Sequence, residues 1–158
     1  MRLIKCTFDL NNKETSVLAC SGFGVVKAFS GQREGRDNPA DTSVEDIGPI
    51  PKGTYFIVDR VSGGHLGFLF DLWGAYGYGT TDHRQWFMLW NPSTGDSTVV
   101  NGVRRRHFRL HPMGPRRLSE GCITVVSPVD FDRFQKFLRS QKPEVPVPHT
   151  PLKAYGTV

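Results

Sequence analysis

The stretches His107-Phe108-Arg109-Leu110-His111 and Cys122-Ile123-Thr124-Val125-Val126 decide the fold predicted for this chain. The first alternates polar and apolar residues, so a β-strand would place its polar side chains on one face and Phe108 and Leu110 toward the core. The second is a run of β-branched residues, which is typical of a buried strand. We therefore predict that these stretches form two core strands of a β-rich fold.

The segment between these strands places Cys122 where a loop enters a strand. Pro112 ends the first strand, and Ser119-Glu120-Gly121 precedes the cysteine. A glycine here lets the backbone approach a substrate closely and directs neighbouring N–H groups toward one point, as an oxyanion hole requires. Because a cysteine nucleophile needs a base to form its thiolate, we predict that His111, the nearest candidate in the chain, is that base.

A purely structural role also fits these residues. A free cysteine at the start of an apolar strand is most often a small core residue, and a histidine on a strand is most often a satisfied polar group. The joint arrangement of His111-Pro112, Ser119-x-Gly121-Cys122 and the basic residues between them favours the catalytic interpretation.

This arrangement resembles the catalytic domain of the L,D-transpeptidases, whose signature is a histidine followed by a Ser/Thr-His-Gly-Cys box. It is more similar still to the small L,D-transpeptidase-like effectors that bacteria deliver through type VI secretion. Residues 48–57 are similar to the Thr-Pro-x-Gly-x-Tyr/Phe-x-Ile strand entry that transpeptidases carry ahead of this box, so the two matches bracket residues 22–126. The matching positions of the box are His111, Ser119, Gly121 and Cys122.

Two positions differ from the transpeptidase pattern. Glu120 replaces the usual histidine, and Thr124 stands where many transpeptidases carry an arginine or asparagine. The interval from His111 to Cys122 is short and suits the effector branch. These differences keep the acyl-enzyme chemistry and affect the choice of acyl acceptor.

The resemblance implies a peptidoglycan-targeting cysteine enzyme. It would remove the terminal D-alanine from tetrapeptide stems as an L,D-carboxypeptidase, exchange it for another D-amino acid as an L,D-transpeptidase, or do both. It would be an antibacterial effector in the periplasm of a target bacterium, with a secretion apparatus and a cognate immunity protein as partners. Ser119 would orient His111 or the turn that precedes Cys122. The residues expected to bind substrate are Arg109, Arg116, Arg117, Tyr76 and Tyr78.

Two alternative classes stay open. A papain-like cysteine peptidase usually places its cysteine before its histidine, opposite to the order here. A basic β module that binds cell-wall polymer or nucleic acid without turnover is the alternative outside enzymes. The formal charge of +5 and Arg104-Arg105-Arg106 are compatible with such binding. A solvated patch is the commoner role of three arginines, and we expect no nucleic-acid partner.

Length and composition favour one domain over residues 1–158. The 158 residues are 38% apolar and include 17 glycines and 11 prolines, and helical periodicity is scarce. We predict a mainly β fold with one C-terminal helix, a β-rich α+β fold, and the resemblance implies an L,D-transpeptidase-like β-sandwich. We expect a monomer without a cofactor. We also expect no bound metal, because no Cys-x-x-Cys or His-Glu-x-x-His spacing is present. Zinc held by His107, His111 and Cys122 is the alternative.

The start of the sequence lacks the continuous apolar core of a signal peptide. No run approaches the roughly 20 apolar residues that a membrane span needs. We therefore expect synthesis in the cytoplasm and export by a route other than general secretion.

Local patterns predict the other elements. Residues 2–10 and 15–20 form a hairpin that places Cys6 opposite Cys20, and two reduced thiols are favoured there over a disulfide. Loop 31–47 is either a solvated connection or a wall or lid of the substrate site. The further strands expected are 22–30, 53–58, 66–72, 85–90 and 98–100, with a tight turn at Asn101-Gly102 that leads into one strand over residues 103–111.

The C-terminal region is expected to begin with a helix. Ser127-Pro128-Val129-Asp130 has a capping serine, a proline at the first position and an acid in the first turn. Residues 143–158 are a Pro-rich tail that either adds a terminal strand or stays outside the sheet. The apolar residues of the helix that would pack on the sheet are Phe131, Phe134, Phe137 and Leu138. Trp73, Trp86 and Trp90 are expected in the core, with stacking on sugar as the alternative.

Overall fold

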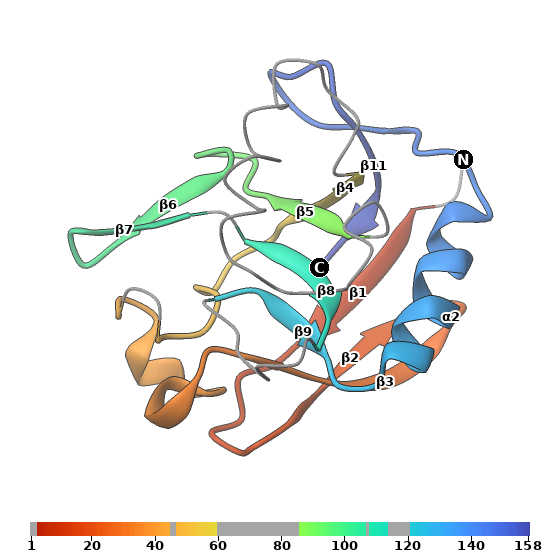
Figure 1. Cartoon of the computed structure of the whole chain (residues 1–158). Helices are drawn as coiled ribbons and strands as arrows, with labels where there is room; N and C mark the ends of the chain where they lie inside the picture. Colours follow the sequence, from red (N-terminus) through yellow and green to blue (C-terminus); the bar gives the residue numbers. More distant parts are fainter. Residues whose placement is uncertain (1–2, 45–46, 60–85, 107, 114–120) are drawn as a thin grey trace.

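A computed structural model of the 158-residue chain describes residues 3–44, 47–59, 86–106, 108–113 and 121–158. Within these ranges the protein is mainly β with one α-helix, as the sequence predicts (Figure 1). The strands are β1 (Ile4–Phe8), β2 (Ser16–Cys20), β3 (Gly24–Ser30), β4 (Phe56–Asp59), β5 (Phe87–Trp90), β6 (Ser97–Val100), β7 (Val103–Arg106), β8 (Arg109–Pro112), β9 (Ile123–Val125), β10 (Val145–Pro146) and β11 (Lys153–Thr157). The helix is α2 (Pro128–Arg139), and two 3-10 turns are η1 (Arg33–Gly35) and η2 (Pro39–Asp41).

Nine of these strands form one sheet in the order β1-β2-β3-β9-β8-β5-β4-β11-β10. A parallel pairing of β1 with β11, at Ile4↔Gly156 and Lys5↔Thr157, joins the two ends of this order. Eight strands therefore close into a ring, with β10 beside the start of β11. Of the two alternatives for residues 143–158, the terminal strand is the one present, and β11 completes the sheet.

The main core fills the inside of this ring. It contains Leu18, Ile57, Phe87, Leu110 and Ile123, all buried, together with apolar residues of α2. Burial of this apolar surface is the principal force that stabilises the fold. The helix supplies Phe131, Phe134 and Leu138 to this core, with Phe137 partly buried against it.

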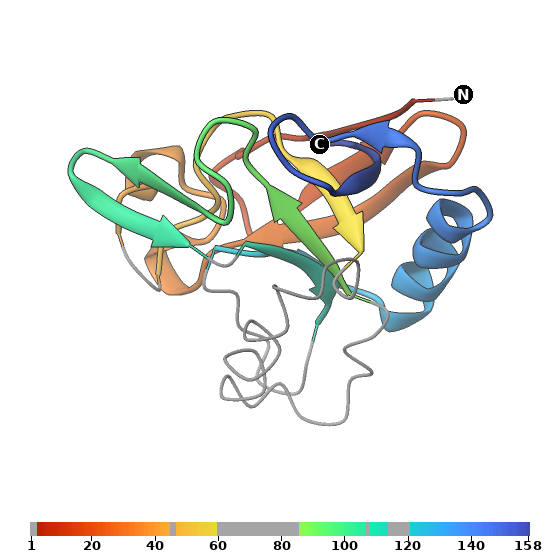
Figure 2. The same cartoon turned by 90° about the horizontal axis from the view of Figure 1, so that it is seen from above.

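Helix α2 begins where the sequence predicts. The Ser127 Oγ accepts a hydrogen bond from the Asp130 N–H at 3.3 Å, and Pro128 occupies the first helical position. The helix lies on the opposite side of the molecule from the hairpin of β6 and β7 (Figures 1 and 2). That hairpin turns at Asn101 and Gly102, whose φ angles of 49° and 80° suit the predicted tight turn.

The N-terminal hairpin has the predicted register, with Cys6 opposite Cys20. The prediction of two reduced thiols is wrong, because the two cysteines form a disulfide across β1 and β2. Register places the sulfur atoms within bonding reach, but the sequence alone does not reveal the oxidation state.

The prediction of one strand over residues 103–111 is also corrected. This stretch forms two strands, β7, which pairs with β6, and β8, which pairs with β5 and β9. Phe108 and Leu110 face the core as predicted. The polar face is buried as well, since Arg109 and His111 are at most 1% exposed.

Two of these predictions lie outside the described residues, namely the strand at 66–72 and the core position of Trp73. In the part of the chain that the structure describes, no helix is long and apolar enough to cross a membrane.

Candidate active site

Strand alternation brings Cys122 and His111 to the same face of the sheet. The parallel strands β8 and β9 pair Leu110 with Ile123 and His111 with Thr124. Leu110 and Ile123 belong to the main core, so Cys122, Thr124 and His111 lie on the opposite face. Cys122 is two residues before the partner of His111, a diagonal position about 7–8 Å away between backbones in a sheet. An imidazole and a thiol can bridge such a separation.

Cys122 immediately precedes β9, as expected from the sequence, and is 4% exposed. Its sulfur is not part of a disulfide, whereas Cys6 and Cys20 are bonded to each other. The chain has three cysteines, so Cys122 alone can act as a nucleophile or be modified as a thiol.

His111 is held on two sides. Its ring stacks on Trp86, with centroids 4.5 Å apart and an interplanar angle of 22°. Its Nδ1 lies 2.8 Å from the Pro112 carbonyl oxygen. A carbonyl oxygen only accepts hydrogen bonds, so Nδ1 carries the proton in this contact and Nε2 is left as the basic nitrogen. The backbone next to His111 therefore fixes the tautomer that a general base requires.

Trp86 reaches His111 through the neighbouring strand. Antiparallel β5 and β8 pair Phe87 with Leu110 and Met88 with Arg109, and this register continues to Trp86 opposite His111. Trp86 is fully buried, as expected for a core tryptophan. The sequence does not indicate its contact with the histidine, although the alternation in residues 86–90 assigns Trp86 and Met88 to one face.

Arg109 lies on the same face of β8 as His111, and its guanidinium binds Asp96. The two Nη atoms contact the two carboxylate oxygens at 2.6 and 3.2 Å, and Nη1 also donates to the Phe108 carbonyl at 2.9 Å. This bidentate pair connects β8 to the start of the β6–β7 hairpin. A role for Arg109 on a substrate carboxylate would require exchange with Asp96 and stays a prediction.

Gly121 occupies a backbone conformation that favours glycine, with φ = 106°. A Cβ atom at this position would lie 2.5 Å from Arg105 Nη2 and 2.9 Å from Phe108 Cε1. Both torsion and space therefore require glycine beside Cys122. This supports the expectation that the residue before the cysteine allows a close backbone approach.

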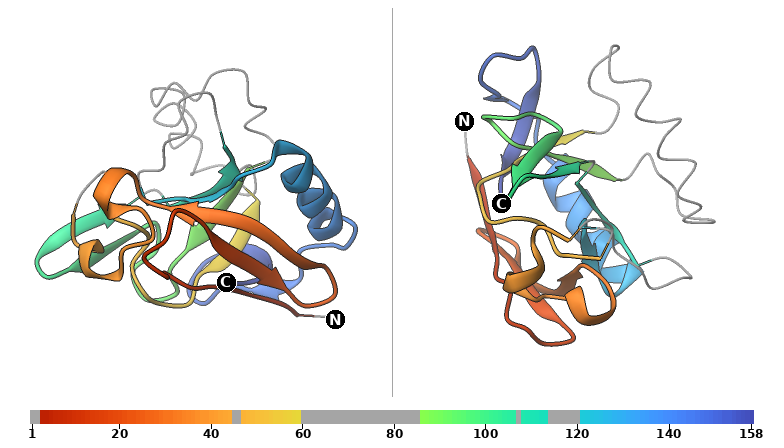
Figure 3. Two further views of the ribbon diagram at one scale, coloured as in Figure 1. Left: turned by 90° about the horizontal axis from the view of Figure 1, so that it is seen from below. Right: turned by 90° about the vertical axis from the view of Figure 1, so that its left-hand side faces the viewer.

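Arg105 corrects the interpretation of the three arginines as a solvated patch. Arg104 is exposed, but Arg105 is only 2% exposed and donates to the carbonyl oxygens of Thr42, Gly48 and Pro49. These contacts fix the loop between β3 and β4 beside the β6–β7 hairpin (Figure 3). No local sequence signal identifies this role, because the acceptors lie more than 50 residues earlier in the chain.

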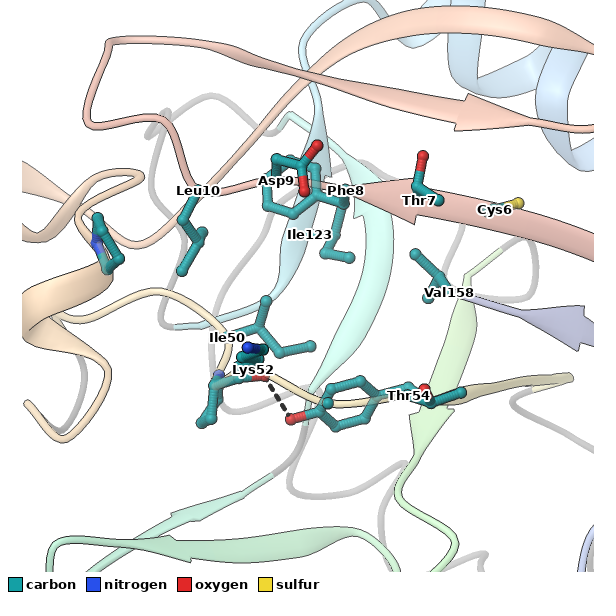
Figure 4. A pocket seen from close by; sticks show the side chains of 14 residues that line it. Cys6, Thr7, Phe8, Asp9, Leu10, Ile50, Lys52, Thr54, Ile123 and Val158 are labelled. Carbon is teal, nitrogen blue, oxygen red and sulfur yellow. Dashed lines mark hydrogen bonds between the residues drawn. The ribbon is translucent and has the colours of Figure 1, made fainter.

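A cavity of about 470 Å³ lies on the other side of β9 from the Cys122 face (Figure 4). Its lining includes Phe8, Leu10, Ile50, Tyr55 and Ile123. Ile123 and Cys122 are adjacent in the chain and point to opposite faces of the sheet. The cavity is therefore separate from the face that carries the cysteine and the histidine.

The other predicted site residues, Ser119, Arg116, Arg117, Tyr76 and Tyr78, lie outside the described residues. His107, part of the alternative zinc set, does so as well. Within the described ranges, no group of three His, Cys, Asp or Glu side chains is arranged to hold a metal ion.

Comparison with protein families places the whole site within one known domain. The family model described as the Tlde1 domain matches residues 24–150, which include His111, Gly121 and Cys122. The chain belongs to the Tlde1 domain family. No match was found among curated proteins or among solved structures.

The Tlde1 domain is a type VI secretion effector domain of the peptidoglycan-targeting kind. The family is linked to enzymatic effector activity and is consistent with secretion into target cells. This agrees with the resemblance carried by residues 48–57 and by the box that ends at Cys122.

Proposed function

We propose that this Tlde1 domain is a cysteine acyltransferase that acts on the tetrapeptide stems of peptidoglycan. The observation that carries the proposal is the position of Cys122, the cysteine outside the Cys6–Cys20 disulfide, on the same sheet face as a histidine with a fixed tautomer. Covalent catalysis requires a nucleophile and a base held close together, and here one directly precedes β9 and the other lies in the adjacent strand β8. The family supplies the substrate class.

In the proposed acylation step, Nε2 of His111 accepts the thiol proton of Cys122 and the thiolate attacks a stem carbonyl. This carbonyl belongs to the third residue, a diamino acid, whose amide bond to the terminal D-alanine breaks. Backbone N–H groups near Gly121 and Cys122 stabilise the tetrahedral oxyanion. The imidazolium returns its proton to the departing amine, so D-alanine leaves and a thioester to Cys122 remains.

The thioester is then resolved by one of two acceptors. Water yields a tripeptide stem, which is L,D-carboxypeptidase activity. A D-amino acid yields an exchanged tetrapeptide, which is L,D-transpeptidase activity. In both cases His111 removes a proton from the acceptor and the thiol of Cys122 is regenerated.

We further propose that the domain acts in the periplasm of a target bacterium and is neutralised in the producing cell by an immunity partner. The Cys6–Cys20 disulfide supports this location, because such bonds persist in oxidising compartments and are rare in the cytosol. We expect a monomer that binds stem peptides and the secretion apparatus.

Mass spectrometry of purified tetrapeptide muropeptides tests the proposal. The substrate is incubated with the wild type, with Cys122→Ala and with His111→Ala, each with and without an added D-amino acid. A double Cys6→Ser, Cys20→Ser variant is the matched control, since it removes the other two cysteines and keeps Cys122. We expect loss or replacement of D-alanine with the wild type and the control only. An unchanged tetrapeptide would contradict the proposal, and binding that survives Cys122→Ala without cleavage would favour a non-catalytic module.

A further inference from the structure

We propose that Ser30 is a positioning residue that fixes the peptide bond between Gly121 and Cys122 and so aims the Cys122 N–H at the reacting carbonyl. This inference rests on the function proposed above, and it concerns a residue in β3 that the transpeptidase motif does not include. Ser30 touches neither the nucleophile nor the base, so its effect would pass entirely through the peptide plane.

The hydroxyl of Ser30 links two segments at the site. Ser30 is fully buried at the end of β3. Its Oγ accepts a hydrogen bond from the Ile50 N–H at 2.8 Å and donates to the Gly121 carbonyl at 3.2 Å. A hydroxyl has a single proton, and because the Ile50 contact uses a lone pair, that proton is available for Gly121.

Because of the geometry of the peptide group, the hydrogen bond from Ser30 to the Gly121 carbonyl also sets the direction of the Cys122 N–H. A trans peptide is planar, so its C=O and N–H point in opposite directions. The Gly121 carbonyl and the Cys122 N–H belong to one peptide group. Ser30 pairs with Ile123 and alternates with Val26 and Ala28, so its side chain projects from the core face of the sheet. A Gly121 carbonyl held by that hydroxyl therefore directs the Cys122 N–H toward the opposite face, which carries the side chains of Cys122 and His111.

Ser30 itself is held rigidly. Its N–H donates to Asp37 Oδ1 at 2.9 Å, and its carbonyl accepts from the Asp37 N–H at 2.8 Å. On the other side, the Arg105 guanidinium occupies the space next to Gly121 and binds carbonyls of the 42–49 segment. Ser30 therefore joins the Ile50 N–H to the Gly121 carbonyl, while Arg105, which packs beside Gly121, binds the carbonyls of Thr42, Gly48 and Pro49.

Two small electrophiles separate this role from a general loss of stability. Acylation of Cys122 by p-nitrophenyl acetate passes through a tetrahedral oxyanion, whereas alkylation by iodoacetamide does not. Both rates would be followed by intact mass for the wild type, Ser30→Ala and Ser16→Ala. Ser16 is the matched control. It is also a buried serine, it lies in β2, the strand beside β3, and its Oγ donates to a backbone carbonyl, that of Asp9.

We expect Ser30→Ala to lower the ratio of acylation rate to alkylation rate by about 10-fold or more, since complete loss of an oxyanion donor costs about 100-fold to 1,000-fold. Ser16→Ala should leave this ratio unchanged. Equal slowing of both reactions in Ser30→Ala, the same change in Ser16→Ala, or no acylation of the wild-type Cys122 would overturn the inference. Wild-type acylation with no turnover of muropeptides would instead contradict only the proposed substrate.

If Ser30→Ala does not fold, Ser30→Cys takes its place. A thiol still accepts from the Ile50 N–H but is a weak donor to the Gly121 carbonyl. Peptide mapping distinguishes the new thiol from Cys122. The same fall in the rate ratio is expected, and an unchanged ratio would count against the role of Ser30.

Discussion

Trp86 stacks on His111 at a centroid distance of 4.5 Å. His111 lies in β8, and Trp86 directly precedes β5, the neighbouring strand of the closed sheet. The indole covers one face of the imidazole, while the Pro112 carbonyl holds the Nδ1 edge at 2.8 Å. Together these contacts restrict both the tilt and the rotation of the ring. A general base positioned in this way loses little freedom when it accepts the thiol proton, which is the entropic benefit of preorganisation.

Trp86→Leu should therefore reduce the turnover of the molecules that remain folded. We expect a loss of about 10-fold to 100-fold in kcat, because small misplacements of a catalytic group have effects of this size. The free energy of unfolding should fall by about 3 kcal/mol, as for a large buried side chain that is shortened. Trp86→Phe, which keeps a ring against His111, should recover most of the activity.

Trp90→Leu is the matched control for this prediction. Trp90 ends β5, the strand that Trp86 directly precedes. It is partly buried and packs against the second apolar cluster, formed by residues such as Val58 and Met88. Its replacement should lower stability and leave kcat close to that of the wild type. Similar kcat losses in both leucine variants would show that stacking on His111 has no special role.

Gly121→Ala should destabilise the protein by more than its torsion angle alone explains. Gly24 has a similar φ of 118° but open space around it, whereas the alanine Cβ at Gly121 would meet Arg105 and Phe108. We expect Gly24→Ala to cost about 1–2 kcal/mol from backbone strain. Gly121→Ala should cost at least about 1 kcal/mol more, because Arg105 and Phe108 must move. Urea unfolding of both variants measures the difference, and equal costs would contradict the packing argument.

The sequence predicts several elements of the fold and part of the site, because the sequence patterns that specify them are local. The Ser127-Pro128 helix start, the Asn101-Gly102 turn and the alternation around His111 each depend on neighbouring residues. The closure of the ring is different, since β1 and β11 come from opposite ends of the chain and pair through only a few residues. No short-range pattern encodes that pairing.

The buried arginines could not be predicted for the same reason. Arg104 and Arg105 are adjacent and chemically identical, yet only Arg105 is buried, because the carbonyls of Thr42, Gly48 and Pro49 meet it there. Ser30 likewise contacts Gly121, which lies 91 residues away. Residues that support a catalytic loop through such distant contacts leave no motif beside the nucleophile.

Reduction of the Cys6–Cys20 disulfide should lower the free energy of unfolding by about 3 kcal/mol, the value expected for a closed loop of this length. The bond joins residues 14 positions apart, in strands of which β1 also closes the ring with β11. Urea unfolding with and without dithiothreitol gives the difference. The double serine variant, unfolded without reductant, should match the reduced wild type. Identical midpoints for the oxidised and reduced proteins would show that the disulfide does not contribute to stability.

Asp37 should make the stability of the protein depend on pH in a direction unusual for an aspartate. Burial raises the pKa of this carboxyl from 3.8 to about 6, and the N–H of Ser30 and the charge of Arg36 lower it only in part. Between pH 4 and pH 6 the folded protein keeps a proton that the unfolded chain has lost. Stability from this group is therefore highest at low pH and falls as the pH rises, by about 3 kcal/mol in total.

Asp37→Asn tests this directly. The asparagine keeps an oxygen that can accept from the Ser30 N–H, and it tolerates the φ of 52° found at this position. We expect the variant to be more stable than the wild type at pH 7, by up to about 3 kcal/mol, and equally stable at pH 4. Asp9→Asn, at an exposed position, is the control. Because the predicted gain comes from removing a buried charge, an equal gain in the Asp9 variant, or a gain for Asp37→Asn that does not change with pH, would contradict it.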